Sequence, residues 1–237
     1  MEKAVILAAG RGTRMEGLTE DRPKPMIPLR GKPMLEHILD RLRMAGFTQA
    51  FIVTGYKGEL IEQHFRGYPM RIAYARQETI DGTARAALLA RDWAGSDSFL
   101  LSYGDILTAA EEWREMARKL DSDPEAAGVA AVKWSEDPWQ GAAVYEENGR
   151  LTRIIEKPAP GTSATHWNSA GSYCFRAEVF DELAAVPKSP RGEYELTSAV
   201  SQLIQSGRKV LLHAFQGEWR DVGRPSDLGA AEKIVSE

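Results

Sequence analysis

The residues best suited to chemistry lie near the N-terminus, where an apolar run leads into a loop of glycines and arginines. Residues 4–9 are apolar and of strand length, and Gly10-Arg11-Gly12-Thr13-Arg14 follows them directly. Because glycine has no Cβ, such a loop can approach an anion closely, and arginine donates paired hydrogen bonds to phosphate oxygens. Lys24 stands between Pro23 and Pro25 and adds another cation. Together these residues predict a binding site for a nucleoside triphosphate.

Two common phosphate-binding loops do not match this pattern. A dinucleotide-binding fingerprint requires a third glycine three residues after the second, and Met15 occupies that position. A Walker A loop requires Gly-Lys followed by serine or threonine, whereas Pro33 follows Gly31-Lys32. The loop is therefore either a different class of nucleotide site or a tight turn with solvated arginines.

Composition excludes several classes of protein. The chain has 237 residues and a net charge of −4, so it has no general basic field for nucleic acid. Its N-terminal apolar run is too short for a signal peptide or a membrane span. The single cysteine, Cys174, excludes an internal disulfide, fits a reducing cytoplasm and lies in an apolar run typical of a core strand. We therefore expect a cytoplasmic protein with no nucleic-acid or membrane partner.

The first half of the chain alternates between strand and helix patterns. Strands are expected at 3–9, 50–54, 70–75, 98–102 and 128–132, and helices at 33–45, 58–65, 82–93 and 108–120. This order predicts an α/β protein with a mostly parallel, Rossmann-like sheet sandwiched by helices. Ligands of such sheets bind beyond the carboxyl ends of the strands, where the loop at Gly10 and the side chain of Asp105 both lie.

The second half favours a smaller lobe on the same sheet. Strands are expected at 141–145, 151–156, 169–175 and 209–214, and helices at 178–185, at 194–206 and from Pro225 onward. Asn148-Gly149 between two apolar runs is a strong hairpin signal. We expect a single domain over 1–237, divided into a first half at about 1–132 and a smaller lobe at about 133–237.

The glycine loop belongs to a longer signature that continues along the chain. Leu7-Ala8-Ala9-Gly10-Arg11-Gly12-Thr13-Arg14 is followed by Leu18-Thr19, Pro23-Lys24-Pro25 and Gly31-Lys32-Pro33-Met34. This series resembles the signature of the sugar-1-phosphate nucleotidyltransferases, most closely glucose-1-phosphate thymidylyltransferases and uridylyltransferases, and it is collinear over nearly the whole chain. The resemblance implies the nucleotide-diphospho-sugar transferase fold, with a nucleotide-binding first half and a sugar-binding smaller lobe.

The resemblance also implies a reaction and the residues that carry it. A sugar 1-phosphate would attack the α-phosphorus of a nucleoside triphosphate in line, with Mg²⁺ as cofactor and pyrophosphate as leaving group. Positioning and charge neutralisation supply most of the rate of such a transfer. Arg14 would neutralise the pyrophosphate, and Lys24 would reach the triphosphate or the attacking group. Asp105 and Asp221 would hold the metal, since Mg²⁺ prefers oxygen ligands. The catalytic set expected at the matching positions is Arg14, Lys24, Asp105, Lys157 and Asp221.

The residues expected to bind the nucleotide follow the same resemblance: Leu7, Ala8, Ala9, Gly10, Gly12, Thr13, Gln77, Gly82 and Thr83. The amide of Gln77 can match both a carbonyl and an N–H of a pyrimidine. Asp81 stands where the family usually has an apolar residue, which leaves the identity of the base open. Asp81 could also cap the helix expected at 82–93.

The residues expected to bind the sugar come from the smaller lobe: Gly141, Glu156, Lys157, Asn168 and Gly171. Glu156 would accept hydrogen bonds from sugar hydroxyls, and Lys157 would hold the sugar phosphate. The segment 189–197 also resembles the family and is expected to have structural or sugar-side roles, with Glu193 and Glu195 solvated or capping. His166, Trp167, Trp139 and Arg224 receive no role, and packing is favoured for the tryptophans at 113, 134 and 139.

The favoured function is transfer from UTP or dTTP to glucose 1-phosphate, with the triphosphate and the sugar 1-phosphate as partners and a homo-oligomer left open. Guanylyl or cytidylyl transfer to mannose or heptose phosphate, or to an alcohol phosphate such as phosphocholine or inositol phosphate, is an alternative, because few contacts set the two substrates. An inactive sensor of nucleotide sugars is a second alternative. The presence of all five expected catalytic residues favours an enzyme.

Overall fold

The computed structural model describes residues 1–236, and its first half alternates strands with helices as the sequence predicts. The strands are β1 (Lys3–Ala8), β2 (Pro28–Leu29), β3 (Lys32–Pro33), β4 (Gln49–Thr54), β5 (Arg71–Arg76), β6 (Phe99–Tyr103) and β7 (Ile106–Thr108). The helices are α1 (Met34–Ala45), α2 (Gly58–His64), α3 (Thr83–Leu88), α4 (Arg91–Ala94) and α5 (Ala110–Asp121), with 3₁₀ turns η1 (Thr13–Met15) and η2 (Lys24–Met26).

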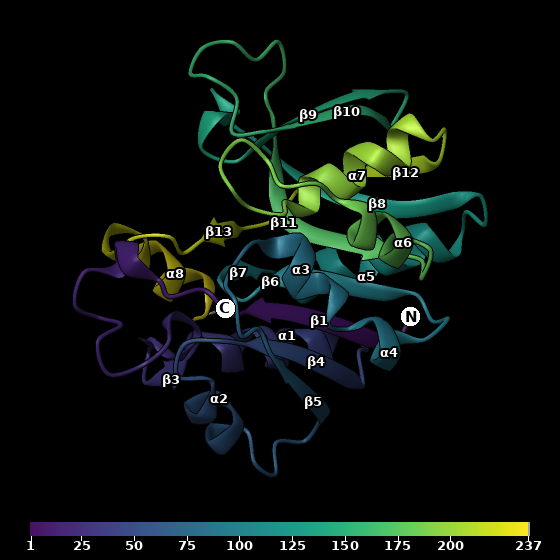
Figure 1. The fold of residues 1–237 in the computed structure, drawn as a ribbon. Helices are drawn as coiled ribbons and strands as arrows, with labels where there is room; N and C mark the ends of the chain where they lie inside the picture. Colours follow the sequence, from purple (N-terminus) through teal and green to yellow (C-terminus); the bar gives the residue numbers. More distant parts are fainter. Residues whose placement is uncertain (237) are drawn as a thin grey trace.

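The second half begins with a long strand and ends in a short helix beside the N-terminal loop (Figure 1). Its strands are β8 (Ala126–Trp134), β9 (Ala142–Glu147), β10 (Arg150–Glu156), β11 (Trp167–Phe175), β12 (Lys209–Ala214) and β13 (Trp219–Asp221). Its helices are α6 (Val179–Ala185), α7 (Leu196–Gln205) and α8 (Leu228–Ile234), with 3₁₀ turns η3 (Pro138–Gln140) and η4 (Pro225–Asp227). The hairpin predicted at Asn148-Gly149 is confirmed, since it joins β9 to β10.

A single nine-stranded sheet contains strands from both halves of the chain. Its order is β5-β4-β1-β6-β11-β8-β12-β10-β9. The strands β5, β4, β1 and β6 are parallel, whereas β11 runs antiparallel to both of its neighbours, β6 and β8. The sheet is thus parallel in the first half and mixed beyond it. The carboxyl ends of β1 and β6 meet at one edge, which is where the predicted site residues of the first half lie.

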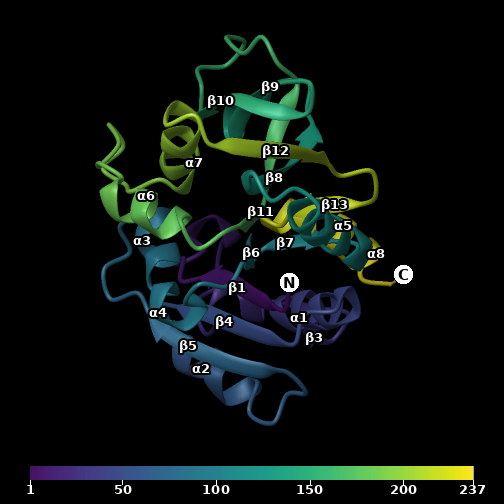
Figure 2. The same ribbon diagram turned by 90° about the vertical axis from the view of Figure 1, so that its right-hand side faces the viewer.

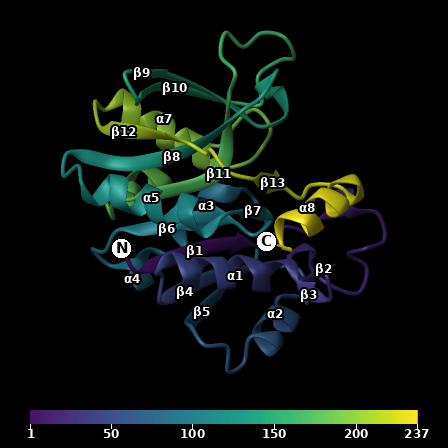
Figure 3. The same cartoon turned by 180° about the vertical axis from the view of Figure 1, so that it is seen from behind.

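Helices cover both faces of this sheet, which is why its central strands are apolar on both sides. One layer contains α1, α5 and α8, and the other contains α3, α6 and α7 (Figures 2 and 3). In α1 the buried residues recur at helical spacing, and Gly46, with a φ of 102°, ends the helix. Cys174 is fully buried in β11, which confirms its predicted core position. Within residues 1–236, no helix is both long and apolar enough to span a bilayer.

The single helix expected at 82–93 is wrong, because two helices occupy this segment. The hydrogen bonds at the end of α3 tighten, with Leu89 N donating to Ala86 O and Ala90 N to Ala87 O. Hydrogen bonds that span three positions are typical of a 3₁₀ turn, which ends the α-helix here. The next helix, α4, then begins at Arg91. The three-residue strands β7 and β13 were not expected, and their pairing shapes the site described below.

Candidate active site

The loop after β1 folds back onto the 3₁₀ turn that carries Lys24. Gly12 has a φ of 66°, and its carbonyl accepts hydrogen bonds from Met15 N at 2.9 Å and Thr19 Oγ1 at 3.3 Å. A Cβ at Gly12 would lie only 2.7 Å from the Cβ of Lys24. Glycine at this position therefore allows both the left-handed turn and the close packing of the loop on Lys24.

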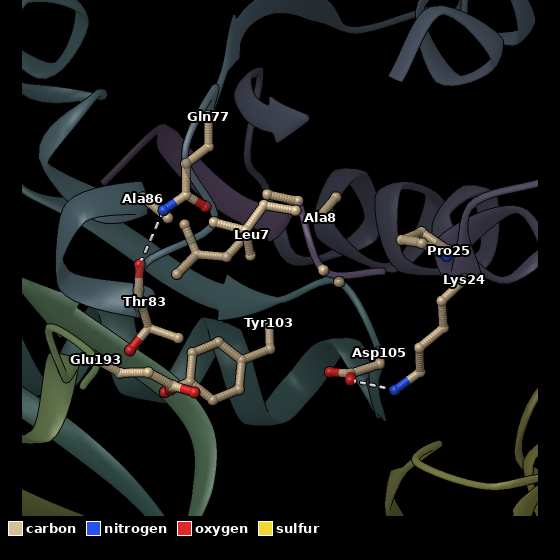
Figure 4. Close-up of a pocket in the computed structure, with 15 residues that line it drawn as sticks. Leu7, Ala8, Lys24, Pro25, Gln77, Thr83, Ala86, Tyr103, Asp105 and Glu193 are labelled. Carbon is tan, nitrogen blue, oxygen red and sulfur yellow. Dashed lines mark hydrogen bonds and ion pairs between the residues drawn. The ribbon is translucent and has the colours of Figure 1, made fainter. Parts of the chain in front are cut away.

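Lys24 is buried despite its charge and forms an ion pair with Asp105. Its Nζ lies 2.5 Å from Asp105 Oδ2, and the two side chains are 10% and 23% exposed (Figure 4). The turn that carries Asp105 is fixed beside β1, because Gly104 N donates to Leu7 O at 2.9 Å. The other carboxylate oxygen of Asp105, Oδ1, is buried and accepts no hydrogen bond from residues 1–236. A buried carboxylate oxygen in this state is a candidate cation ligand.

The pairing of β13 with β7 brings Asp221 beside Asp105. The two strands are antiparallel, and Val222 N donates to the backbone oxygen of Asp105 at 3.0 Å. Burial by the surrounding protein, and next the negative charge of Asp105, raise the pKa of Asp221 to about 6, although solvent still reaches the residue through the open site. Lys24 and Arg14 act in the opposite direction. Two facing carboxylates with an unsatisfied oxygen fit a hard divalent cation.

A second cluster of possible metal ligands lies away from this site, on α5 and β12. It consists of Glu112, Glu115 and His213. The carboxylate of Glu112 is already engaged, since its Oε1 accepts backbone hydrogen bonds from Gln216 at 2.8 Å and Gly217 at 2.6 Å, and His213 Nε2 lies 2.9 Å from its Oε2. Glu112 thus holds the turn that leads into β13, the strand that carries Asp221, so its role is structural.

A cavity of about 270 Å³ opens at the carboxyl ends of β1 and β6. Seven of the predicted nucleotide residues line it: Leu7, Ala8, Ala9, Gly10, Gln77, Gly82 and Thr83. Gly12 and Thr13 line neither this cavity nor the larger one described below, within the described residues. In Figure 4, Gln77 and Thr83 stand at one end of the cavity, and the Lys24–Asp105 pair stands at the other.

The wall of this cavity is joined to a segment from the smaller lobe. Tyr194 N donates to Asp81 O at 2.8 Å, and Ala84 N donates to Tyr194 O at 2.8 Å. Gly82 lies between these bonds with a φ of 133°, and a Cβ there would lie 2.3 Å from Tyr194 O. Thr83 adds a third bond, because its Oγ1 accepts from Leu196 N at 2.9 Å. This wall of the cavity and the segment before α7 therefore form one unit.

The capping role considered for Asp81 is wrong. The N-cap of α3 is Gly82, and no side chain among residues 1–236 caps this helix. Instead, the carboxylate of Asp81 accepts a hydrogen bond from Gln77 Nε2 at 3.3 Å, and Gly82 O accepts from the same nitrogen at 3.1 Å. The amide of Gln77 is 7% exposed, and Asp81 and Gly82 are the acceptors for its nitrogen among the described residues.

A larger cavity, of about 820 Å³, contains all five predicted sugar residues in its walls. At its far side Lys157 N donates to Gly141 O at 2.7 Å, and a Cβ at Gly141 would lie 2.2 Å from Asn168 Oδ1. Gly171 has a φ of 73° at the bulge in β11, where a Cβ would lie 3.0 Å from the side chains of Ile106 and Tyr103. These glycines allow the cavity walls to approach one another closely.

Glu156, at the end of β10, is held by side chains from the segment 189–197. Thr197 Oγ1 donates to Glu156 Oε2 at 3.1 Å, and Arg191 Nη1 donates to Oε1 at 3.2 Å. Burial, and next the charge of Glu195, raise the pKa of Glu156 above its usual range. Glu195 is only 5% exposed and accepts from Ser189 Oγ at 3.0 Å, so its predicted solvated or capping role is wrong.

The two cavities meet at four residues that line both: Thr83, Tyr103, Asp105 and Glu193. Arg14, Lys157 and Asp221 lie in the walls of the larger cavity, and Lys24 lies in those of the smaller one. Arg14 extends toward the Asp221 strand, since a Cβ at Gly223 would lie 3.7 Å from its Nη1. A molecule in the smaller cavity would therefore meet one in the larger cavity beside Asp105, among groups suited to phosphate and a cation.

Sequence reasoning did not name several residues of these walls. Tyr103 is an example, whereas Arg191 belongs to the segment 189–197, for which structural or sugar-side roles were expected. Among the unassigned aromatic residues, Trp139 lines the larger cavity, and Trp113 is buried as predicted. Trp134 is 61% exposed and stacks on His166, so it packs at the surface and not in the core.

Comparisons with known proteins agree with this arrangement. The family model for nucleotidyl transferases matches residues 3–237. A UTP–glucose-1-phosphate uridylyltransferase of Haloferax volcanii is 39% identical over 241 residues, which cover 99% of this chain and 97% of the relative. A bifunctional GlmU protein of Methanocaldococcus jannaschii is 36% identical over 233 residues, and the chain spans 54% of that longer relative.

Solved structures share the fold at lower identity. A UDP-glucose pyrophosphorylase complexed with UDP-glucose superposes with a TM-score of 0.88 at 20% identity, over 100% of this chain and 98% of that chain. The inositol-1-phosphate CTP transferase of T. maritima superposes with a TM-score of 0.87 at 20% identity, over 100% and 95%. The fold and the family predicted from the loop signature are confirmed, and this chain belongs to the nucleotidyl transferase family, as a sugar-phosphate nucleotidyltransferase.

Proposed function

We propose that this protein transfers a nucleotidyl group from UTP or dTTP to glucose 1-phosphate, with Mg²⁺ as cofactor. The observation that carries the proposal is the meeting of the two cavities at Asp105, beside the buried Lys24 and near Asp221. The relative from Haloferax volcanii, named for UTP and glucose 1-phosphate, supports this choice of substrates.

In this proposal each group of residues positions one part of the reaction. The base enters the smaller cavity against Gln77, and the triphosphate extends over Gly10 toward Lys24 and Arg14. In the larger cavity, Lys157 holds the phosphate of the acceptor and Glu156 accepts its hydroxyls. An oxygen of the acceptor phosphate forms a bond to the α-phosphorus, the bond from α-phosphorus to the bridging β-oxygen breaks, and pyrophosphate leaves. The attacking oxygen is already anionic, so no general base is required.

Asp105 and Asp221 would hold the Mg²⁺. The unsatisfied Oδ1 of Asp105 and the all-oxygen donor set suit this ion. When bound, the ion neutralises charge on the phosphate oxygens. Lys24 already pairs with Oδ2 of Asp105, so Oδ1 would remain for the ion.

Pyrophosphate release tests the function directly. Five nucleoside triphosphates are crossed with a panel of sugar and alcohol phosphates in the presence of Mg²⁺. We expect turnover for UTP or dTTP with glucose 1-phosphate, which Lys24→Ala and Asp105→Ala abolish. The surface variant Lys32→Ala, which removes a lysine outside both cavities, is the control for the loss of a charge. Absence of turnover across the whole grid by folded protein would refute the proposal.

Cytidylyl transfer to an alcohol phosphate is the second candidate, because the inositol-1-phosphate CTP transferase shares this fold over the whole chain. The same grid separates the two candidates. Turnover confined to CTP with inositol phosphate or phosphocholine would establish the second function in place of the first.

A further inference from the structure

The contact between Asp81 and Gln77 bears on which base the smaller cavity accepts. The backbone of Gln77 is fixed, since its N donates to Thr54 O at 2.8 Å. Its Nε2 donates to Gly82 O at 3.1 Å and to Asp81 Oδ1 at 3.3 Å. Both acceptors lack a hydrogen, so an amide turned the other way would set Oε1 against two oxygens. These two contacts therefore fix the orientation of the Gln77 amide.

In this orientation, Gln77 can offer a base only its carbonyl oxygen, Oε1. Both hydrogens of Nε2 are engaged, and Oε1 accepts no hydrogen bond from the described part of the chain. Gln77 therefore presents an acceptor and no donor. Uracil and thymine carry an N–H at ring position 3, which satisfies this acceptor. Cytosine has a lone pair at the same ring position, which would face the Gln77 oxygen unfavourably.

We propose that Asp81 is a positioning residue that sets the base preference of the site. By holding Nε2 of Gln77, it favours uracil or thymine over cytosine. Asp81 lines neither of the two cavities, so it acts through Gln77 and does not touch the base. Without Asp81, only Gly82 O holds Nε2, so the whole amide rotates more readily and can present Nε2 to the lone pair of cytosine. The proposal rests on the proposed function and deepens it by assigning the donor base.

Calorimetric titration with UDP and CDP in the absence of acceptor tests this role. We expect the wild-type protein to bind UDP more tightly than CDP, and Asp81→Leu to reduce the ratio of the two affinities by about 5- to 10-fold, the size of one hydrogen bond. Asp81→Asn keeps an oxygen acceptor and should preserve most of the preference. Glu78→Ala is the matched control, because Glu78 is 80% exposed and its carboxylate contacts only Arg76 among the described residues, at 3.7 Å.

Each outcome bears on the proposal. A wild-type protein that binds CDP as tightly as UDP, or an Asp81→Leu variant with the wild-type ratio, would overturn it. If circular dichroism shows that Asp81→Leu does not fold, Asp81→Ala replaces it. Pyrophosphate release from UTP and CTP by the same preparations keeps the two proposals separate. A wild-type protein that shows no turnover but keeps its UDP preference refutes only the proposed function. A ratio of UTP use to CTP use that is the same in the wild-type protein and in Asp81→Leu refutes only the role of Asp81.

Discussion

Lys24→Met should destabilise the protein, and a second substitution at Asp105 should restore part of the loss. Lys24 is the only cation within ion-pairing distance of Asp105 among residues 1–236. Its removal leaves a carboxylate whose Oδ2 loses its partner and whose Oδ1 has none. Breaking a buried pair costs about 3–5 kcal/mol of unfolding free energy, and the 23% exposure of Asp105 places this pair near about 3 kcal/mol. For a chain of this length that is a fall in Tm of about 6–12 °C.

The double variant distinguishes this cause from loss of packing. In Lys24→Met/Asp105→Asn the carboxylate charge that Lys24 neutralised is also removed, so its Tm should exceed that of Lys24→Met alone. The matched control is the surface pair of Lys32 and Asp40, at 2.7 Å with side chains 39% and 33% exposed. The same cycle there should give a coupling of less than about 1 kcal/mol. Thermal unfolding of the metal-free protein measures all variants. Wild-type stability of Lys24→Met, or a coupling no larger than that of the control, would refute the reasoning.

Three further substitutions probe the site. Asp221→Asn should raise the Tm of metal-free protein at about pH 8 and leave it unchanged at about pH 4. The pKa of Asp221 is about 6 in the folded protein and 3.8 ordinarily, so its carboxylate lowers stability as the pH rises from 3.8 through 6. Calorimetry that gives equal Tm shifts at both pH values would contradict this. Gly82→Ala should weaken UDP binding at least about 10-fold, because its Cβ would meet Tyr194 O at 2.3 Å. Gly31→Ala should not weaken it, because Gly31 also has a positive φ, of 79°, but no atom lies within 4 Å of its Cβ position. Gly141→Ala should raise the KM for sugar phosphate but leave UDP affinity unchanged, since its Cβ would displace the Asn168 side chain. An unchanged KM in steady-state kinetics, or a weaker affinity for UDP in calorimetry, would exclude a sugar-side role for Gly141.

Much of the first half of the fold could be predicted because its signals are local. The apolar run before Gly10 forms β1, and α1 carries buried residues at helical spacing before Gly46. Parallel strands bring their carboxyl ends to one edge of a sheet, so Gly10 and Asp105 were expected to lie together at that edge. Both residues line the smaller cavity. The roles of the individual site residues stay predictions until the kinetic tests above are made.

Other features had no local signal. The pairing of β7 with β13 joins segments of three residues each that are more than one hundred positions apart, and no periodicity can appear in so short a run. This pairing places Asp221 beside Asp105, a contact that only the family resemblance anticipated. Glu195 was misplaced for the same reason, because its burial results from contacts with Ser189 and the neighbourhood of Glu156, not from its place before α7.

The join at Gly82 and Tyr194 gives the two cavities a common wall. Gly82 lines the smaller cavity, and the segment that ends in Tyr194 carries Arg191, which contacts Glu156 in the larger cavity. Two backbone bonds and the Thr83 side chain connect these segments, so a displacement of one must displace the other or break the bonds. Because Gly82 has no side chain, the two backbones approach within a distance that excludes any Cβ. The walls of the two cavities are thus held relative to each other by backbone contacts, and an in-line transfer requires such fixed positions for its two substrates.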